Sequence, residues 1–452
     1  MTHSPLLTDL YQLTMMQGYL DYSMTEIGVF EFFVRKIPKE RNFLMAAGLE
    51  QVVDFLENLK FQDEDLDFLA KEGRFHRDFL DYLASLHFTG DVHAMPEGTI
   101  FFPDEPILRI AAPIPEAQLV ETRIINILQF QSIIASKAAR LTLTTTPNKL
   151  LVDFDLRRAH GSEAGLFAAR ASYLAGFSGS STVLAGKLYG LPIFGTMAHS
   201  FIQAHDSETL AFEHFAHTQP QNVVLLIDTY DTEKGAQNVV DLAPKLAGKG
   251  ITIKAVRLDS GDMIRHSFEV RKILDHGGLQ HVRIFTSGNL DEYKLASFVA
   301  ANAPIDGFGV GTKMVTSSDR PYLDCAYKLV EYGGIACRKK SEGKATWPGR
   351  KQVYRSFDQQ GKMDSDVITV EDDSRAAQPS SRKVTPLIRP VMLEGKRIVD
   401  LPSLSEAREY ALTELERLPP PLKSITQSKS FPVEISQPLR DLAAEVDERS
   451  SG

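Results

Sequence analysis

Cysteine and long apolar runs are scarce in this sequence. Two cysteines, Cys325 and Cys337, occur in 452 residues. They match neither zinc nor thioredoxin spacing, and an extracellular disulfide framework would use more of them. No stretch of about 18 uninterrupted apolar residues occurs, so no membrane span is predicted. The first residues show no basic segment followed by an apolar one, so no signal peptide is expected. These absences predict a cytoplasmic protein.

The chain also lacks an excess of positive charge and a P-loop. Its net charge is −9 at pH 7, which argues against nucleic-acid binding because such a surface needs a basic face. A few arginines at one place can still bind a small anion. No Gly-x-x-x-x-Gly-Lys-Ser/Thr sequence occurs, so no Walker-type nucleotide site is expected. With 43% hydrophobic and 24% charged residues, the composition is that of a globular protein.

The pattern of apolar runs divides the chain into four parts. Residues 1–115 predict an α+β N-terminal domain. Residues 116–323 begin with a long amphipathic helix and continue as alternating strands and helices. Residues 324–418 return to strands, which we expect to pack on the N-terminal domain, and end in a helix. Residues 419–452 predict a tail, a linker with one short amphipathic helix.

The second part predicts a parallel sheet. Its short apolar runs alternate with helical segments and lie at 149–154, 190–195, 223–228, 251–258, 282–286 and 307–310. Repeated βα units imply parallel strands joined by right-handed crossovers. The fold class is therefore α/β, an irregular (β/α) barrel with an α+β N-terminal domain completed by C-terminal strands. Eight clean strands cannot be counted, so the barrel can be incomplete.

Two sequence pairs have the spacing of a helix capping box. Asn289 precedes Glu292 by three residues, and Ser403 precedes Glu406 by the same interval. In this motif the first side chain bonds a backbone N–H of the first turn, and the acidic side chain bonds back to the cap. We therefore predict helices that begin after residues 289 and 403.

The stretch LPIFGTMAHS, residues 191–200, is the candidate centre of the site. Residues 191–194 are predicted to form a buried strand, and His199 follows at its carboxyl end, where ligands collect in α/β proteins. Polar clusters end the neighbouring strands at 154–158, 228–231, 257–262, 287–289 and 307–312. We predict that these clusters form one site with His199 as its reactive group. A lone histidine at the end of a strand is more often structural or a ligand of solvent than catalytic.

The glycines and charged residues of these clusters suit a phosphorylated sugar. Free backbone N–H groups at Gly309 and Gly311 can bind phosphate, although Gly-x-Gly-x-Gly at 307–311 is a weak motif alone. Arg157 can pair with phosphate or carboxylate. Asp259 and Asp262 can hold ribose hydroxyls or the waters of Mg²⁺.

Other side chains suit a small aromatic ring and a reactive imidazole. Asp228 could accept a hydrogen bond from one imidazole nitrogen of His199 and leave the other nitrogen as a nucleophile. Phe154 and Tyr11 present flat faces that can sandwich a ring. From periodicity alone, Tyr11 is more often a packing residue, here of a helix predicted from residue 10 to about residue 20.

A metal site formed by histidines is not expected. His214 and His217 lie three residues apart on a predicted helix, and one turn of a helix can bring such a pair together. A zinc site needs at least a third protein ligand, and none is evident nearby. We predict a surface pair, and the residues that bind any Mg²⁺ stay unassigned.

The chain resembles nicotinate phosphoribosyltransferases. The likeness runs from LLTDLY (6–11) to about residue 355. It is strongest in DFDLRRAHG (153–161), GTMAHS (195–200), LIDTYDT (226–232), VRLDSGD (256–262), TSGNLDE (286–292) and DGFGVGTKMVT (306–316). The resemblance implies the type II phosphoribosyltransferase fold. It also implies phosphoribosyl transfer from 5-phosphoribosyl 1-diphosphate to nicotinate in NAD biosynthesis, coupled to hydrolysis of ATP with Mg²⁺.

The resemblance also implies roles for individual residues. His199 matches the histidine that ATP phosphorylates, and Asp228 matches the carboxylate that orients it. Phe154 is similar to the aromatic residue that stacks on the pyridine ring. Tyr11 is similar to a tyrosine that reaches the other ring face across a homodimer interface, so shared active sites are expected.

The remaining substrate contacts are implied in the same way. Arg157 and Arg257 match positions near the ring and the phosphates, and Asp259 and Thr312 lie in the matching motifs. Gly288, Gly309 and Gly311 match the seat of the ribose 5-phosphate. Asn289 stands where relatives have Asp, which puts its ribose contact in doubt.

Ser181 bears on the choice of substrate. Relatives that use nicotinamide carry an acidic residue there, and a carboxylate would repel nicotinate, so a hydroxyl favours the acid. Two alternatives stay open at this point. One is a phosphoribosyltransferase for nicotinamide or quinolinate, and the other is a catalytically silent barrel that binds a nucleotide.

Overall fold

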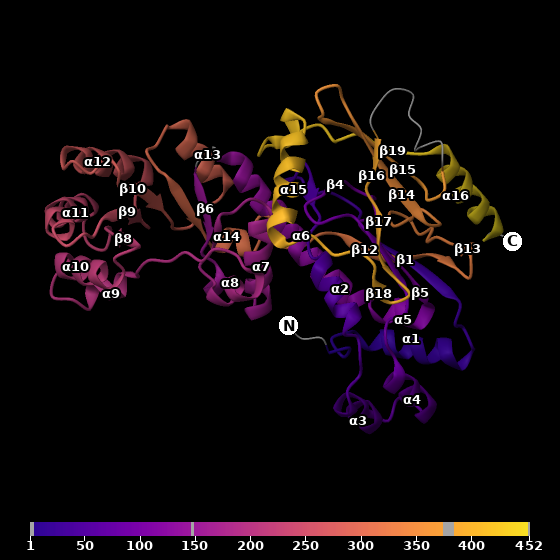
Figure 1. Cartoon of the computed structure of the whole chain (residues 1–452). Coiled ribbons are helices and arrows are strands. Elements are labelled where there is room, and N and C mark those ends of the chain that lie inside the picture. The colour runs from indigo at the N-terminus through magenta and orange to yellow at the C-terminus, as the bar shows by residue number, and fades with distance from the viewer. Residues whose placement is uncertain (1–3, 146–148, 374–383, 451–452) are drawn as a thin grey trace. The chain divides into compact units, whose positions relative to one another are not determined.

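The protein folds into two compact units (Figure 1). The computed structural model describes residues 4–145, 149–373 and 384–450. The first unit combines Met1–Ser136 with Arg320–Gly452, and the second is Lys137–Asp319. The helix α6 (Glu121–Thr144) contributes to both units. Within the described ranges, none of the helices has both the length and the apolar character of a membrane span.

The first unit contains a seven-stranded sheet with the order β13-β12-β1-β5-β3-β17-β18. Its strands, and those of a separate β2–β4 pair, are β1 (Ile27–Val34), β2 (Leu44–Met45), β3 (Asp91–Ala94), β4 (Ile100–Phe101), β5 (Leu108–Pro113), β12 (Cys325–Tyr332), β13 (Ile335–Ala336), β17 (Arg389–Leu393) and β18 (Lys396–Arg397). The central β1 pairs antiparallel with β5 and with β12. Val29, Ala111 and Val330 from these three strands form a buried apolar cluster. This pairing confirms that C-terminal strands complete the N-terminal α+β domain.

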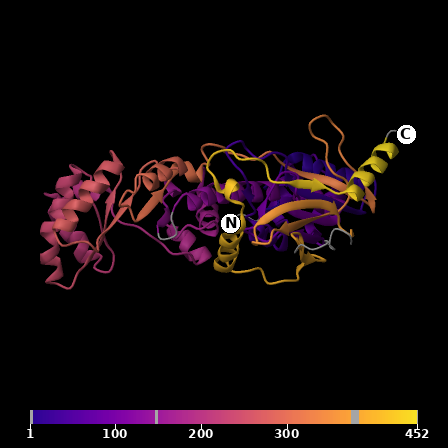
Figure 2. The same ribbon diagram turned by 90° about the horizontal axis from the view of Figure 1, so that it is seen from above.

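A second sheet of the same unit has the order β16-β14-β15-β19. Its strands are β14 (Lys351–Phe357), β15 (Met363–Val370), β16 (Val384–Pro386) and β19 (Val433–Ile435). The predicted amphipathic helix of the tail is α16 (Gln437–Arg449), which lies beside β15 (Figure 2). The expectation that the tail is otherwise a linker was wrong, because β19 pairs in parallel with β15.

Helices surround these sheets in the first unit. They are α1 (Leu10–Asp21), α2 (Leu49–Glu57), α3 (Asp63–Glu72), α4 (Arg77–Ser85), α5 (Ile114–Leu119), α15 (Leu404–Arg417) and the short η2 (Pro420–Lys423). The capping box of Ser403 and Glu406 at the start of α15 is confirmed. The single helix expected from residue 116 is divided at Val120 into α5 and α6.

The second unit contains a curled parallel sheet with the order β7-β6-β11-β10-β9-β8, which is half of a barrel. The strands are β6 (Leu150–Asp153), β7 (Gly179–Ser180), β8 (Val223–Leu226), β9 (Ile253–Leu258), β10 (Arg283–Thr286) and β11 (Gly307–Val310). The helices are η1 (Leu156–Arg158), α7 (Ser162–Leu174), α8 (Val183–Tyr189), α9 (His199–Gln203), α10 (Glu208–Thr218), α11 (Thr232–Ala247), α12 (Met263–His276), α13 (Glu292–Ala300) and α14 (Thr312–Val315). The irregular α/β barrel architecture is thereby confirmed.

The predicted buried strand at 191–194 was wrong. This segment makes a single parallel bridge, between Ile193 and Ser180, and Ile193 is exposed. Its partner β7 has only two residues, and Pro192 has no N–H to donate to a ladder. The segment is therefore an extended connection that leads to α9 and His199.

The two faces of the parallel sheet differ because side chains alternate along a strand. Phe308 of β11 stacks on Phe298 of α13, with ring centroids 6.0 Å apart. Gly307 and Gly309 face the opposite side, against the rings of Phe285 and Phe154. One face is thus covered by helices, and the other is lined by aromatic side chains.

Buried charges hold α13, the helix that follows the loop after β10. Glu292 is fully buried, and it accepts hydrogen bonds from Lys137 Nζ at 2.6 Å and Arg140 Nε at 3.0 Å. Lys137 also pairs with Asp319 at 2.9 Å. This network positions the start of α13 and with it the preceding loop.

Candidate active site

The predicted polar clusters meet at one edge of the parallel sheet. Leu258 of β9 is level with Thr286 of β10, Arg257 is level with Leu226 of β8, and Asp153 of β6 is level with Val310 of β11. The residues that follow these strands therefore leave the sheet on the same side. Ligands bind at this carboxyl edge in parallel α/β sheets.

Asp259 bonds residues in or just after several of the strands that end at this edge. Its Oδ1 accepts from Arg257 Nη2 at 2.9 Å and also bonds the Ser287 hydroxyl. Its backbone N–H donates to Asp228 Oδ2 at 2.8 Å, an oxygen that also accepts from Ser260 Oγ. Burial raises the pKa of Asp259, but the Ser287 hydrogen bond and the Arg257 charge outweigh it, so the pKa lies below its usual range. Asp259 is therefore a carboxylate at neutral pH.

His199 is the first residue of α9 and has two neighbours at this edge. Its Nδ1 lies 3.1 Å from Thr229 Oγ1, and its Nε2 lies 3.9 Å from Asp259 Oδ2. The expected hydrogen bond from His199 to Asp228 is absent among the described residues: Asp228 Oδ2 accepts from Asp259 N and Ser260 Oγ, and Thr229 takes its place beside Nδ1. The imidazole is 39% exposed and can meet a ligand.

Arg257 lies between a carboxylate and an aromatic ring. Its guanidinium carbon is 5.4 Å from the centroid of Phe154, within the range of a cation–π contact. Its Nε donates to Ser287 Oγ at 2.8 Å, and its Nη1 donates to the Met197 carbonyl at 3.3 Å. The guanidinium is therefore fixed beside the flat face of Phe154.

Two glycines are required by the local backbone. Gly288 has a φ of +95°, and a Cβ atom there would overlap the carbonyl oxygen of Asp259. A Cβ atom at Gly309 would lie 2.5 Å from the Phe154 ring. These glycines let the loop after β10 approach Asp259 and let the Phe154 ring lie against β11. Gly311 directly precedes α14, where Thr312 is the first residue.

A pair of buried carboxyls lies where β6 ends. Burial raises the pKa of Asp153 to about 6, although the Ser180 hydroxyl bonds its Oδ2. Burial and the nearby Asp153 raise the pKa of Asp155 well above its usual range. Asp155 also lies against Gly311, where a Cβ would be 3.2 Å from its Oδ1. The pair therefore holds a proton to a higher pH than a solvent-exposed carboxyl would, beside the glycine turn.

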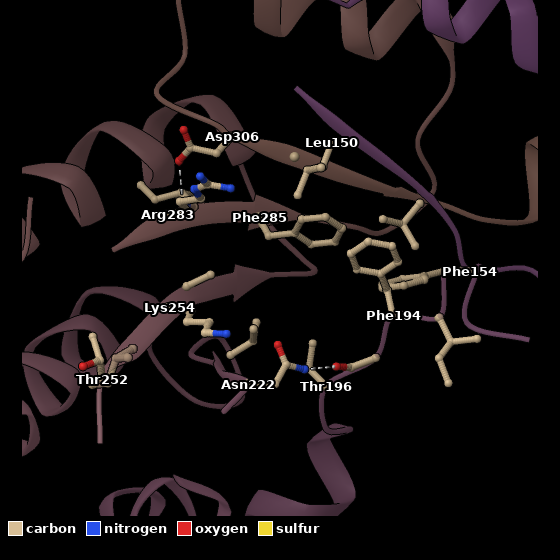
Figure 3. Close-up of a pocket in the computed structure, with 18 of the residues that line it drawn as sticks. Leu150, Phe154, Phe194, Thr196, Asn222, Thr252, Lys254, Arg283, Phe285 and Asp306 are labelled. Atoms are coloured by element: carbon tan, nitrogen blue, oxygen red, sulfur yellow. Dashed lines mark hydrogen bonds between the residues drawn. The ribbon is translucent and has the colours of Figure 1, made fainter. Parts of the chain in front are cut away.

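A cavity of about 710 Å³ lies along the aromatic face of the sheet. Figure 3 shows the rings of Phe154, Phe194 and Phe285 together at one end, with Thr252 and Lys254 away from them. The cavity therefore offers an apolar surface that continues from the ring of Phe154.

Three more predicted residues flank the same edge. Ser181 directly follows β7, and its N–H donates to the carbonyl of Asp153. Arg157 is exposed on η1. Asn289 has a φ of +52°, in the loop after β10. Thus the structure brings Ser181, Arg157 and Asn289 to the carboxyl edge of the parallel sheet.

The expected capping box of Asn289 and Glu292 was wrong. The N-cap of α13 is Asp291, which accepts from Lys294 N at 2.8 Å and pairs with Lys313. Glu292 instead accepts hydrogen bonds from the buried Lys137 and Arg140 of α6. Asp291 therefore ties the loop after β10 to the helix that follows Gly311.

Two further expectations can be compared with the structure. Asp262, a candidate for ribose or Mg²⁺ waters, is the N-cap of α12 and accepts from Arg265 N. His214 does not pair with His217; its Nδ1 lies 3.1 Å from His205 Nε2, and His217 contacts Lys249. No group of three or more His, Cys, Asp or Glu in the described residues could hold a metal ion.

Tyr11 lies in the first unit, on α1. Its hydroxyl is 3.5 Å from Glu121 Oε2, and the side chain is 47% exposed. Burial and the charge of Glu121 raise its pKa. The ring therefore keeps a face open to solvent within its own unit.

Sequence analysis missed two residues of the site. Thr229 contacts the imidazole, and Ser287 contacts both Arg257 and Asp259. Both lie inside clusters that the sequence singles out, but a hydroxyl carries no signal of which neighbour it will bond.

Three models of one protein family together match most of the chain. A model described as the nicotinate phosphoribosyltransferase (NAPRTase) family matches residues 150–345, and models of the N-terminal and C-terminal domains of nicotinate phosphoribosyltransferase match residues 6–129 and 374–443. Nicotinate phosphoribosyltransferase pncB2 of Mycobacterium tuberculosis is 47% identical over 433 residues, which cover 95% of this chain and 91% of that protein. The human nicotinate phosphoribosyltransferase is 32% identical, covering 97% and 96%.

Solved structures give the same result. The crystal structure of human nicotinic acid phosphoribosyltransferase superimposes with a TM-score of 0.85 and 29% identity, covering 97% of this chain and 99% of that one. Nicotinate-nucleotide pyrophosphorylase from Pyrococcus furiosus superimposes with a TM-score of 0.74 and 27% identity, covering 91% and 94%.

The half-barrel with its polar carboxyl edge, joined to an α+β unit completed by C-terminal strands, defines a type II phosphoribosyltransferase fold. The long matches then identify the particular family. The chain belongs to the nicotinate phosphoribosyltransferase family.

Proposed function

We propose that this protein transfers the phosphoribosyl group of 5-phosphoribosyl 1-diphosphate to nicotinate, giving nicotinate mononucleotide and diphosphate in NAD biosynthesis. The observation that carries the proposal is the contact of Arg257 with the face of Phe154, next to the glycine loop at Gly288. A flat acid can lie against the ring and present its carboxylate to the guanidinium. Free N–H groups of glycine turns are suited to phosphate.

The transfer reaction depends mainly on how the pyridine ring and the sugar are positioned. When diphosphate leaves the anomeric carbon, positive charge develops on the sugar, and the pyridine nitrogen forms the new bond to that carbon. Phe154 and Arg257 fix the ring in place, and holding two reactants in register lowers the barrier without a covalent contribution from the protein. The backbone N–H groups of the glycine loops bind the phosphate of the ribosyl diphosphate and hold the sugar in position.

His199 is the residue that ATP phosphorylates in this proposal. In the tautomer that this proposal assigns, the proton lies on Nδ1 and is donated to Thr229 Oγ1, 3.1 Å away, which leaves the lone pair on Nε2. That nitrogen attacks the γ-phosphorus of ATP; a nitrogen–phosphorus bond forms, the bond to the bridging oxygen breaks, and ADP leaves. ATP and the ribosyl diphosphate both carry a polyphosphate on a ribose, so one site can take them in turn.

The residues present fit a Mg²⁺ ion carried by these polyphosphates. Asp228 Oδ1 is buried and has no hydrogen-bond partner among the described residues, and Asp259 Oδ2 faces the imidazole. Mg²⁺ prefers carboxylate and phosphate oxygens. When bound, the ion would neutralise charge on the diphosphate groups.

The acid is the expected substrate for two reasons. Arg257 supplies a positive charge, and Ser181 supplies no negative charge that would repel a carboxylate. A homodimer is the expected assembly, with Tyr11 of the partner subunit against the other face of the substrate ring. The exposed ring face of Tyr11 supports this arrangement.

The experiment that tests the proposal compares three pyridines. Purified protein is given the ribosyl diphosphate with nicotinate, nicotinamide or quinolinate, each with and without ATP and Mg²⁺, and diphosphate release is measured. Turnover of nicotinate, stimulated by ATP, is expected. Preference for nicotinamide would contradict the substrate, and ATP-independent decarboxylation of quinolinate would point to the other reaction. No diphosphate release with any base would indicate a silent nucleotide-binding barrel.

The phosphohistidine has its own test. ATP labelled at the γ-phosphate is expected to label the protein, and His199→Ala should lose the label and the ATP stimulation while keeping weak ATP-independent transfer. His217→Ala is the matched control, because His217 lies on α10 and contacts Lys249. Full labelling of His199→Ala would assign the phosphoryl group to another residue.

A further inference from the structure

Ser287 is a buried hydroxyl at the centre of the candidate active site. It follows β10, is 3% exposed, and its N–H donates to the Leu258 carbonyl. Its Oγ lies 2.8 Å from Arg257 Nε and also bonds Asp259 Oδ1. A hydroxyl has one proton to donate and lone pairs to accept. Ser287 therefore accepts from the arginine and donates to the carboxylate.

These contacts determine how much of the Arg257 guanidinium is left for a ligand. A guanidinium has five N–H donors. Nε is used by Ser287, one Nη2 donor by Asp259, and one Nη1 donor by the Met197 carbonyl. Because Ser287 and Asp259 are bonded to each other, they occupy the Nε–Nη2 edge as a linked pair of acceptors. One donor remains on each terminal nitrogen.

We propose that Ser287 is a positioning residue that makes the site prefer an acid to its amide. Together with Asp259 it holds one edge of Arg257, so that the remaining donors meet the carboxylate of the pyridine substrate. This inference rests on the proposed function and names the residue that sets its substrate preference.

The alternative arrangement of Arg257 shows why the hydroxyl matters. Without it, the strongest remaining partner of the guanidinium is Asp259 alone, and arginine pairs with a carboxylate through two parallel hydrogen bonds. Such a pair would draw the Nε–Nη2 edge onto Asp259 and rotate the guanidinium relative to Phe154, so the remaining donors would no longer point at the carboxylate of the substrate. In the structure, Asp259 is shared between Ser287 and Arg257 and offers only Oδ1 to them. The other oxygen, Oδ2, faces His199.

The test is direct binding of two ligands to the whole protein, measured by calorimetry without turnover. Ser287→Ala is expected to weaken nicotinate binding at least about tenfold, the lower end of the range for a hydrogen bond to a charged group. Nicotinamide, which has no carboxylate, is expected to change by less than about twofold. Steady-state kinetics should show the same split, with a larger rise in KM for nicotinate than fall in kcat.

Two further variants act as controls. Ser267→Ala removes another buried hydroxyl of the same unit, which bonds the Ile264 carbonyl within its own helix, and should leave both affinities unchanged. Ser287→Cys keeps the size of the side chain but bonds weakly, so it should give an intermediate loss. It also provides the measurement if Ser287→Ala does not fold.

The outcomes separate this inference from the proposed function. If the unchanged protein does not bind nicotinate, the proposed function fails. If it binds nicotinate and Ser287→Ala binds it equally well, or loses both ligands by the same factor, the positioning role of Ser287 is refuted.

Discussion

The Nδ1 atom of His199 and the hydroxyl of Thr229 lie 3.1 Å apart. This contact, rather than one to Asp228, sets the orientation of the imidazole. It turns Nδ1 toward the segment that follows β8 and Nε2 toward Asp259. A neutral hydroxyl therefore sets which ring nitrogen faces Asp259.

Replacement of Thr229 by Val should slow phosphorylation of His199. Valine has the same shape but accepts no hydrogen bond, so the imidazole loses its orientation at a cost of about 1 kcal/mol, or about fivefold in rate. Rapid-quench measurement of label transfer from γ-labelled ATP gives the rate. Thr229→Ser keeps the hydroxyl and should stay near the original rate. An unchanged rate in Thr229→Val would show that another contact orients the ring.

Alanine at Gly288 should impair binding of the ribosyl diphosphate. Its Cβ would overlap the Asp259 carbonyl at a positive φ, so the loop must move. We expect KM for this substrate to rise at least about tenfold, since displaced phosphate donors lose their charge-assisted bonds. Gly190→Ala is the control, because Gly190 has a φ of +67° with no atom near its Cβ position. Equal effects of the two substitutions would attribute the loss to backbone strain alone.

The Asp153–Asp155 pair should make the protein less stable as pH rises. Their pKa values are raised, to about 6 for Asp153, so the folded protein holds a proton that the unfolded chain has lost. Stability then falls as pH rises from about 4 through the folded-state pKa values. Between pH 5.5 and 8, Tm of the unchanged protein should fall about 3 °C more than Tm of Asp155→Asn. Asp241→Asn, at an exposed position of α11, should follow the unchanged protein; if Asp155→Asn does so too, the pair does not hold the proton.

Glu292→Gln should destabilise the second unit strongly. The substitution removes the negative charge between Lys137 and Arg140 while all three side chains stay buried. Breaking a buried ion pair from one side costs about 3–5 kcal/mol, measurable by denaturant unfolding. Glu269→Gln, in an exposed pair with Lys272, should leave the unfolding midpoint unchanged. A small effect at Glu292 would mean that Asp319 alone neutralises Lys137.

Mixing two defective chains should restore activity if active sites are shared between subunits. Tyr11→Ala and Arg257→Ala are each expected to be defective, because one lacks the outer ring contact and the other the acid contact. A heterodimer of the two contains one site with both residues intact. Recovery of a substantial part of the activity, measured on purified heterodimer, is expected. A verified heterodimer without recovery would place Tyr11 outside the site.

Much of the architecture could be predicted because it depends on local patterns. The βα rhythm from residue 149 to residue 310 sets parallel strands, and those strands bring their carboxyl ends to one edge. The Ser403–Glu406 capping box needs only four consecutive residues, and it formed as expected. The Asn289–Glu292 box failed because buried Lys137 and Arg140 compete for the same carboxylate. Its failure depends on residues about 150 positions away.

The sequence by itself determined the fold class, the family and the set of polar clusters at the sheet edge. Tertiary structure alone decided which side chains bond within that set: Thr229 on His199, and Ser287 between Arg257 and Asp259. The physical reason is that strand pairing follows periodicity along the chain, whereas a hydroxyl or carboxylate takes the nearest suitable partner in space. That partner is fixed only when neighbouring strands are in register.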